Sequence, residues 1–76
     1  MIKKLKEAIL LKDASVKKVQ FDRYWFYDLK DMSDYLNEDL TGVEYIQLPF
    51  LVDDEMISTK CATLEDIERF RGLDIL

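Results

Sequence analysis

The sequence predicts an α+β fold, a small single domain over residues 1–76 with the element order α-β-β-α-β-β-α, in which helices pack on a mostly antiparallel sheet. Apolar residues recur at helical spacing in three segments of the chain. Between these segments, β-branched and aromatic residues form runs that are typical of strands. The hydrophobic content of 49% and the aromatic content of 12% exceed what a disordered acidic chain carries, so we expect a packed core.

The first predicted helix covers residues 2–12. Its apolar positions share one face and are separated by lysines, and Lys12 stands near the end, where the helix dipole favours a cation. These apolar positions are Ile2, Leu5, Ala8 and Ile9.

Residues 16–27 predict β structure in one of two arrangements. Apolar and aromatic residues fill 16–21 and 24–27, with Asp22 and Arg23 between them. A two-residue hairpin turn requires positive φ and favours glycine or asparagine, so Asp22 and Arg23 are a weak turn signal. A hairpin and one long bent strand therefore both stay open.

A second helix is expected to begin after Asp28, which caps it, and to end near Gly42. Its apolar side consists of Leu29, Met32, Leu36 and Leu40. At about 100° per residue, three carboxylates gather on the opposite side of this helix and face outward. This acidic stripe consists of Asp31, Asp34 and Glu38.

The rest of the chain predicts a hairpin followed by a helix. The apolar run over 43–52 changes its alternation near Tyr45, which indicates a bulge, and Pro49 indicates an edge strand because proline has no N–H. Residues 56–60 are expected to pair with this run across a turn made of Asp53, Asp54 and Glu55. The last helix is capped by Thr63 and ended by Gly72. Its inward side is expected to be Leu64, Ile67 and Phe70.

The residue inventory argues against catalysis and against a bound metal or cofactor. The chain has no histidine and one cysteine, Cys61, so it lacks both the usual general base and the ligands of a zinc site. Asn37 begins a segment that resembles the first half of a calcium loop, but Leu48 stands where the loop needs a glutamate. We therefore expect no enzymatic activity, no cofactor and no metal.

Cys61 also bears on the compartment of the protein. A lone cysteine forms no internal disulfide, which favours a reducing compartment, and we expect its side chain to be buried at a strand end. The alternative is a thiol whose pKa is lowered by the adjacent helix start. The apolar run over 8–11 is too short for a signal peptide, and no stretch has the length of a membrane span. The expected location is cytoplasmic, without a membrane partner.

Charge is divided unevenly along the chain. Lysines dominate the first nineteen residues, whereas residues 20–59 contain only Arg23 and Lys30 against many carboxylates, and the formal net charge is −5. Because charge of one sign selects partners, the sequence predicts an acidic, non-enzymatic protein-interaction module, a small regulatory or inhibitory protein that occupies the basic surface of a partner protein.

Two surfaces are candidates for partner binding. The acidic candidate combines the acidic stripe with the second hairpin turn: Asp31, Asp34, Glu38, Asp53, Asp54 and Glu55. The aromatic candidate is Tyr24 with Phe26, which share one face of a strand while Trp25 and Tyr27 share the other. Direct nucleic-acid binding is not expected, because few cations accompany these aromatic residues.

Two alternatives to this function stay open. Carboxylates in a row along a helix resemble phosphates in spacing, so the chain is also a candidate mimic of nucleic acid, of the phage or mobile-element type, that blocks a DNA- or RNA-binding protein. The other alternative is a structural subunit of a homo-oligomer, because edge strands and exposed aromatic residues offer contact surfaces.

Overall fold

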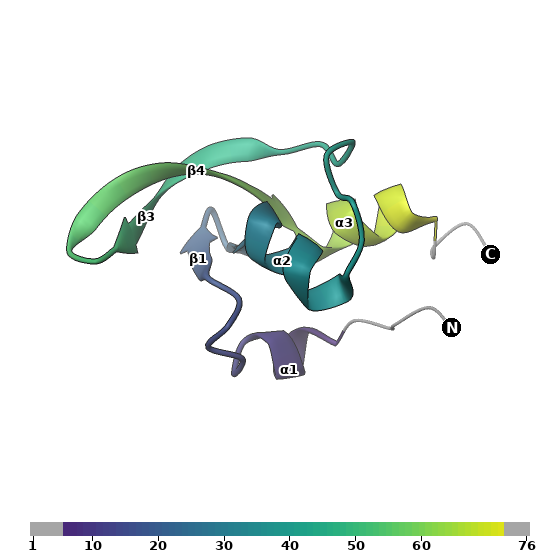
Figure 1. Cartoon of the computed structure of the whole chain (residues 1–76), viewed down its shortest axis with the longest axis horizontal. Coiled ribbons are helices and arrows are strands. Elements are labelled where there is room, and N and C mark those ends of the chain that lie inside the picture. The colour runs from purple at the N-terminus through teal and green to yellow at the C-terminus, as the bar shows by residue number, and fades with distance from the viewer. Residues whose placement is uncertain (1–5, 73–76) are drawn as a thin grey trace.

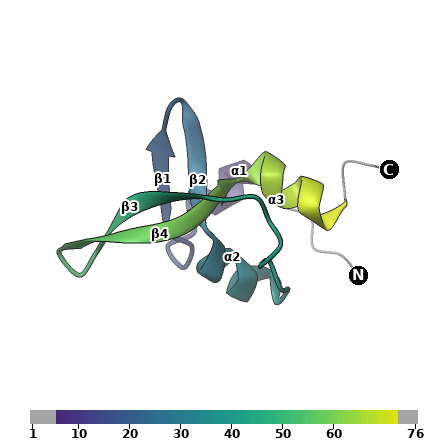
Figure 2. The ribbon, with the colours of Figure 1, turned by 90° about the horizontal axis from the view of Figure 1, so that it is seen from above.

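The computed structural model describes residues 6–72, which form a curled four-stranded antiparallel sheet with helices α1, α2 and α3 (Figures 1 and 2). The elements are α1 Glu7–Leu10, β1 Lys18–Phe21, β2 Tyr24–Asp28, α2 Leu29–Leu36, β3 Ile46–Val52, β4 Glu55–Thr63 and α3 Leu64–Arg71. The strand order is β1-β2-β4-β3, and every neighbouring pair is antiparallel. The predicted α+β class and the predicted order of elements are confirmed.

One face of the sheet carries the main core. Tyr27 of β2 and Ala62 of β4 lie opposite each other in register, and both are buried against the helices. The rest of this core is formed by Leu10, Val16, Met32, Leu36, Leu40, Val43 and Ile67. The opposite face, which carries the neighbouring pair Phe26 and Thr63, contributes no buried residue to this cluster. The main core therefore lies on the side of Tyr27 and Ala62, although Asp28 and Cys61 on the other side are buried as well.

The segment between β1 and β2 is a hairpin, which resolves the alternative that the sequence left open. Asp22 and Arg23 have φ angles of 51° and 73°, so the turn is left-handed at both central positions without glycine. Such turns match the right-handed twist of the strands, and the flanking rings of Phe21 and Phe26 meet edge-to-face with centroids 6.2 Å apart. Pairing and ring contact between the two strands therefore override the weak turn signal.

Helix α1 differs from the predicted helix over residues 2–12. Residues 2–5 lie outside the described part of the chain, and the described helix ends at Leu10. Leu10 is fully buried and Ile9 is exposed. The helix therefore turns Leu10 toward the core, and not Ile9 as the spacing predicted. The Asp13 carboxylate accepts hydrogen bonds from the N–H and hydroxyl of Ser15, which turns the chain toward β1.

Helix α2 begins as predicted but ends earlier. The Asp28 carboxylate accepts the Lys30 N–H at 2.9 Å, as an N-cap does. The helix ends at Leu36, not near Gly42, because Asn37 takes the left-handed conformation with φ 55° and the Ser33 hydroxyl donates to the Glu38 carbonyl. The prediction of a helix that continues to Gly42 is wrong.

The second hairpin confirms the predicted edge strand and corrects its bounds. β3 lies at the edge of the sheet and includes Pro49. It begins at Ile46 in continuous register with β4, so the bulge predicted near Tyr45 is wrong. Asp53 and Asp54 form the turn with φ angles of 50° and 66°, and Glu55 is the first residue of β4.

Helix α3 has the predicted cap and end, with one difference on its inward side. The Thr63 hydroxyl accepts the Asp66 N–H at 3.2 Å, and Gly72 closes the helix at φ 80°. Ile67 is fully buried, but Phe70 is half exposed, with its ring against Gly42. A Cβ at Gly42 would lie 2.5 Å from the Phe70 ring, so a larger residue there would displace this ring.

Replacing Arg23 with glycine should stabilise the first hairpin. A left-handed conformation costs a non-glycine residue about 1 kcal/mol, and glycine removes that cost. We expect the Arg23→Gly variant to raise the free energy of unfolding by about 1 kcal/mol in urea titrations. A lower free energy of unfolding in the variant would contradict this prediction. It would mean that the Arg23 side chain stabilises the fold by more than its left-handed conformation costs.

The structure also predicts a loss of stability at alkaline pH. The Tyr27 hydroxyl donates to the Glu7 carboxylate at 2.8 Å, and burial together with this contact raises the pKa of Tyr27 above its ordinary value of 10. As the pH rises past 10, the unfolded chain loses this proton first, so the stabilisation present at lower pH is lost. The urea concentration at the midpoint of unfolding should fall as the pH is raised from about 8 to about 11. This fall should be smaller in the Tyr27→Phe variant, which has no phenolic proton to lose.

Candidate interaction surface

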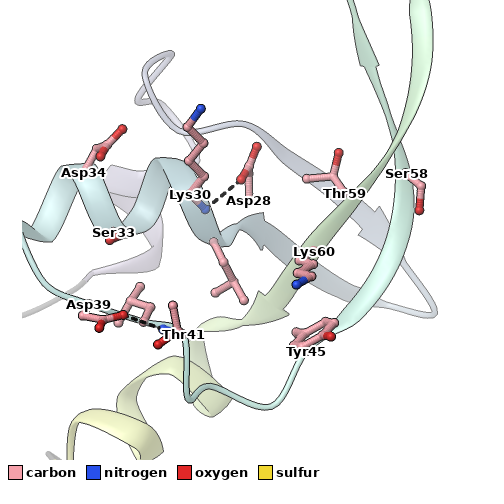
Figure 3. A pocket seen from close by; sticks show the side chains of 12 residues that line it. Asp28, Lys30, Ser33, Asp34, Asp39, Thr41, Tyr45, Ser58, Thr59 and Lys60 are labelled. Carbon is pink, nitrogen blue, oxygen red and sulfur yellow. Dashed lines mark hydrogen bonds between the residues drawn. The ribbon is translucent and has the colours of Figure 1, made fainter.

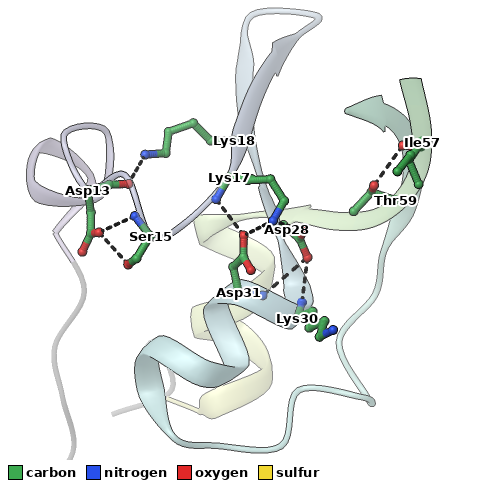
Figure 4. Close-up of polar contacts among 9 residues, drawn as sticks. All are labelled: Asp13, Ser15, Lys17, Lys18, Asp28, Lys30, Asp31, Ile57 and Thr59. Atoms are coloured by element: carbon green, nitrogen blue, oxygen red, sulfur yellow. Dashed lines mark hydrogen bonds and ion pairs between the residues drawn. The ribbon is translucent and has the colours of Figure 1, made fainter. Parts of the chain in front are cut away.

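The acidic stripe predicted from the sequence does not form. The Asp31 carboxylate accepts the Lys17 N–H at 2.9 Å and pairs with the Lys17 ammonium at 3.0 Å, which ties the residue before β1 to α2 (Figure 4). The same contact raises the pKa of Lys17 above its ordinary value. Asp31 therefore has a structural partner within the chain.

Glu38 also has a partner within the chain. It lies in the loop after α2, where its two oxygens accept Nε and Nη2 of Arg71 at 3.0 and 2.9 Å. The Arg71 side chain is 3% exposed and the Glu38 side chain 36%, so this bidentate pair joins the loop to the end of α3 with its carboxylate partly in solvent. Of the three residues of the predicted stripe, only Asp34 is an exposed carboxylate on the surface of α2.

The other predicted acidic residues do come together. Asp53 and Asp54 form the turn between β3 and β4, and Glu55 is the first residue of β4. All three are exposed. Figure 1 places this turn at the far left of the molecule, away from α2. The predicted acidic surface is therefore divided between α2 and the second hairpin turn. Only the three residues at the hairpin turn lie together.

The aromatic residues of β2 alternate as predicted. Tyr27 is buried and Trp25 packs against the core, whereas Tyr24 is exposed and Phe26 half-buried on the other face. Tyr24 lies opposite Phe21 in register, and Phe21 is also exposed. An apolar patch thus occupies the end of the first hairpin.

The second hairpin exposes a pair that the sequence reasoning missed. Leu51 and Met56 lie opposite each other next to the turn, with exposed fractions of 66% and 63%. Phe50, on the alternate face, is buried. The signal was present in the run Phe50, Leu51, Val52, since an edge strand cannot bury three consecutive apolar residues that alternate between two faces.

The described surface also has a groove of about 540 Å³ between α2 and β4 (Figure 3). Its charge is mixed: Lys30 and Lys60 line it together with Asp28, Asp34 and Asp39. The Lys60 ammonium lies 5.0 Å from the centre of the Tyr45 ring. Asp39 accepts the Thr41 N–H at 3.0 Å, a backbone contact that lowers the pKa of Asp39.

Cys61 is buried, as the first of its two interpretations predicted. Its Sγ lies 3.5 Å from the Ile46 carbonyl oxygen, and burial raises the pKa of the thiol. The alternative of a lowered pKa beside the helix start is therefore wrong. Within residues 6–72, no three side chains of the histidine, cysteine, aspartate and glutamate types are placed to hold a metal ion.

Comparison with protein-family models, with curated proteins and with solved structures found no match to this chain. In the part of the chain that the structure describes, no helix has the length and apolar character needed to cross a bilayer. The candidate surface is therefore defined by geometry alone: the ends of the two hairpins, with their exposed apolar pairs and the carboxylates beside the second pair.

The ion pairs predict different effects for the three residues of the acidic stripe. Asp31→Asn should lower the free energy of unfolding by about 1 kcal/mol, because Lys17 is partly exposed to solvent. Glu38→Gln should cost about 2 kcal/mol, because it removes the carboxylate from a bidentate contact with the buried Arg71 guanidinium. Asp34→Asn is the matched control and should change stability by less than about 0.5 kcal/mol. Urea titration of the three variants checks this ranking, which equal effects would contradict.

Proposed function

We propose that the protein is a non-enzymatic protein-interaction module, a small regulatory or inhibitory protein that occupies a partner's surface with the ends of its two hairpins. The observation that supports this most is the placement of the exposed apolar side chains. They stand in register as pairs, Phe21 with Tyr24 and Leu51 with Met56. Single exposed apolar residues are ordinary, but adjacent pairs on strands form preorganised contact surface.

Contact through side chains is favoured over strand addition at the sheet edges. β1 is only four residues long, and β3 contains Pro49, which offers no N–H to another strand. Both features are ways in which proteins limit pairing at an exposed edge. The hairpin ends are thus better suited to bury side chains in a partner than to extend its sheet.

Nucleic-acid mimicry receives less support from this geometry. Mimicry by a helix needs a row of free carboxylates, whereas Asp31 and Glu38 are engaged with Lys17 and Arg71. The carboxylates at the second hairpin turn flank an apolar pair, which resembles the rim of a protein interface more than a phosphate backbone.

The proposal is tested with serine variants of the two hairpin ends. We expect Tyr24→Ser combined with Leu51→Ser to weaken binding of a captured partner at least tenfold, since apolar anchors dominate interface energies. Ile9→Ser is the control, because Ile9 is a similarly exposed apolar residue on α1. Capture with the full chain, quantified by mass spectrometry and repeated by calorimetry with the identified partner, measures the effect.

Three outcomes would contradict the proposal. Equal binding by the double variant and the wild type would remove the hairpin ends from the interface. Equal losses in the double variant and in Ile9→Ser would indicate a nonspecific apolar effect. Sedimentation showing a stable homo-oligomer that retains no other protein would favour the structural-subunit alternative.

A further inference from the structure

We infer that the β3–β4 hairpin inserts its end into an apolar pocket of a different protein, and that lysine or arginine side chains line the rim of this pocket. This inference rests on the proposed function and specifies both the inserting element and the chemistry of the partner.

The first step is the reach of the hairpin. β4 pairs with β2 only at Cys61, Ala62 and Thr63, whereas it pairs with β3 along the whole of Ile46–Val52. Residues 47–60 are therefore a two-stranded ribbon that continues beyond the four-stranded part of the sheet. Figures 1 and 2 both show this ribbon extending from the helices to one end of the molecule. Its end is free to enter a concave site.

The second step is the apolar pair at that end. Leu51 and Met56 are the two most exposed large hydrophobic residues of the described chain. They lie opposite each other in register, on the face opposite to the buried Phe50. A leucine fixed on a strand beside a flexible methionine fills an apolar pocket of irregular shape. The pair therefore provides the anchor of the contact.

The third step is the charge around the anchor. Asp53, Asp54 and Glu55 lie between Leu51 and Met56 along the chain, and all three are exposed. None of the three forms an ion pair with another residue in 6–72. Burial of the anchor brings these carboxylates to the rim of the partner's pocket, where cations satisfy them and like charges repel.

The fourth step argues against a second copy of this chain as the partner. The larger groove, of about 760 Å³, lies between the first hairpin and α3. It carries one cation, Arg23, against the carboxylates Glu7, Asp22, Glu65, Asp66 and Glu68. The groove between α2 and β4 sets two lysines against three aspartates. Neither of these two grooves has a cationic rim, so neither complements the acidic turn, and we assign the pocket to another protein.

A photo-cross-linking experiment tests both parts of the inference. p-Benzoylphenylalanine replaces Met56 in one full-length variant and Tyr24 in another, and each is irradiated in the cell that encodes the protein. We expect the probe at position 56 to label a protein other than this chain, at an apolar site flanked by lysine or arginine. Labelling of a second copy, or of a site flanked by carboxylates, would overturn the inference.

A pair of glycine variants separates binding from folding. Asp54→Gly and Asn37→Gly each relieve one left-handed position, and Asp54→Gly also removes a carboxylate from the acidic turn. Asn37 is the matched control because it is uncharged and lies at the end of α2, away from both hairpins. We expect Asp54→Gly to bind the labelled partner about tenfold more weakly while folding at least as stably as the wild type, with a reduced salt dependence of binding. Asn37→Gly should bind as the wild type does. Equal binding by the two variants would contradict a role for the acidic turn.

The two positions of the probe distinguish the failure of this inference from the failure of the proposed function. Labelling of a partner from position 24 but not from position 56 would overturn the inserted ribbon and leave the interaction module standing. Labelling from neither position, with no protein retained in capture, would overturn both.

Discussion

The short ladder between β2 and β4 is the constraint on which the rest of the fold depends. It comprises three residue pairs, of which Tyr27 with Ala62 lies at the centre and is fully buried. The two hairpins meet only there, and both of the longer helices begin at its ends, because Asp28 and Thr63 are at once the last strand residues and the N-caps of α2 and α3. Strand pairing therefore sets where each helix starts and which face it covers.

The acidic residues serve two different purposes, which the net charge alone conceals. Glu7, Asp31 and Glu38 accept hydrogen bonds from Tyr27, Lys17 and Arg71 and hold separate segments together. Within residues 6–72, the carboxylates at the second hairpin turn form no ion pair and are exposed to solvent. A chain with a formal charge of −5 is thus less uniformly acidic toward a partner than its composition indicates.

The helices cover the four-stranded part of the sheet, whereas the exposed apolar pairs stand at the hairpin ends beyond it. Tyr27 and Ala62 are buried against the helices, and Leu51 and Met56 lie on the same face of the second hairpin as Ala62 but near its far end (Figure 1). The left-handed aspartates at the second turn bear a conformational cost that glycine would avoid. In the proposed mode of action these charges flank the inserted pair, which provides a reason for aspartate at that turn.

The sequence by itself determined the type and order of the elements, the caps at Asp28 and Thr63, the stop at Gly72 and the edge position of Pro49. These signals are local, since a cap or an alternation is written within a few neighbouring residues. The tertiary structure decided the hairpin at Asp22 and the early end of α2. It also decided that Glu38 of the predicted acidic stripe pairs within the chain. Its partner Arg71 is 33 residues away in the sequence, and no local pattern indicates such a contact.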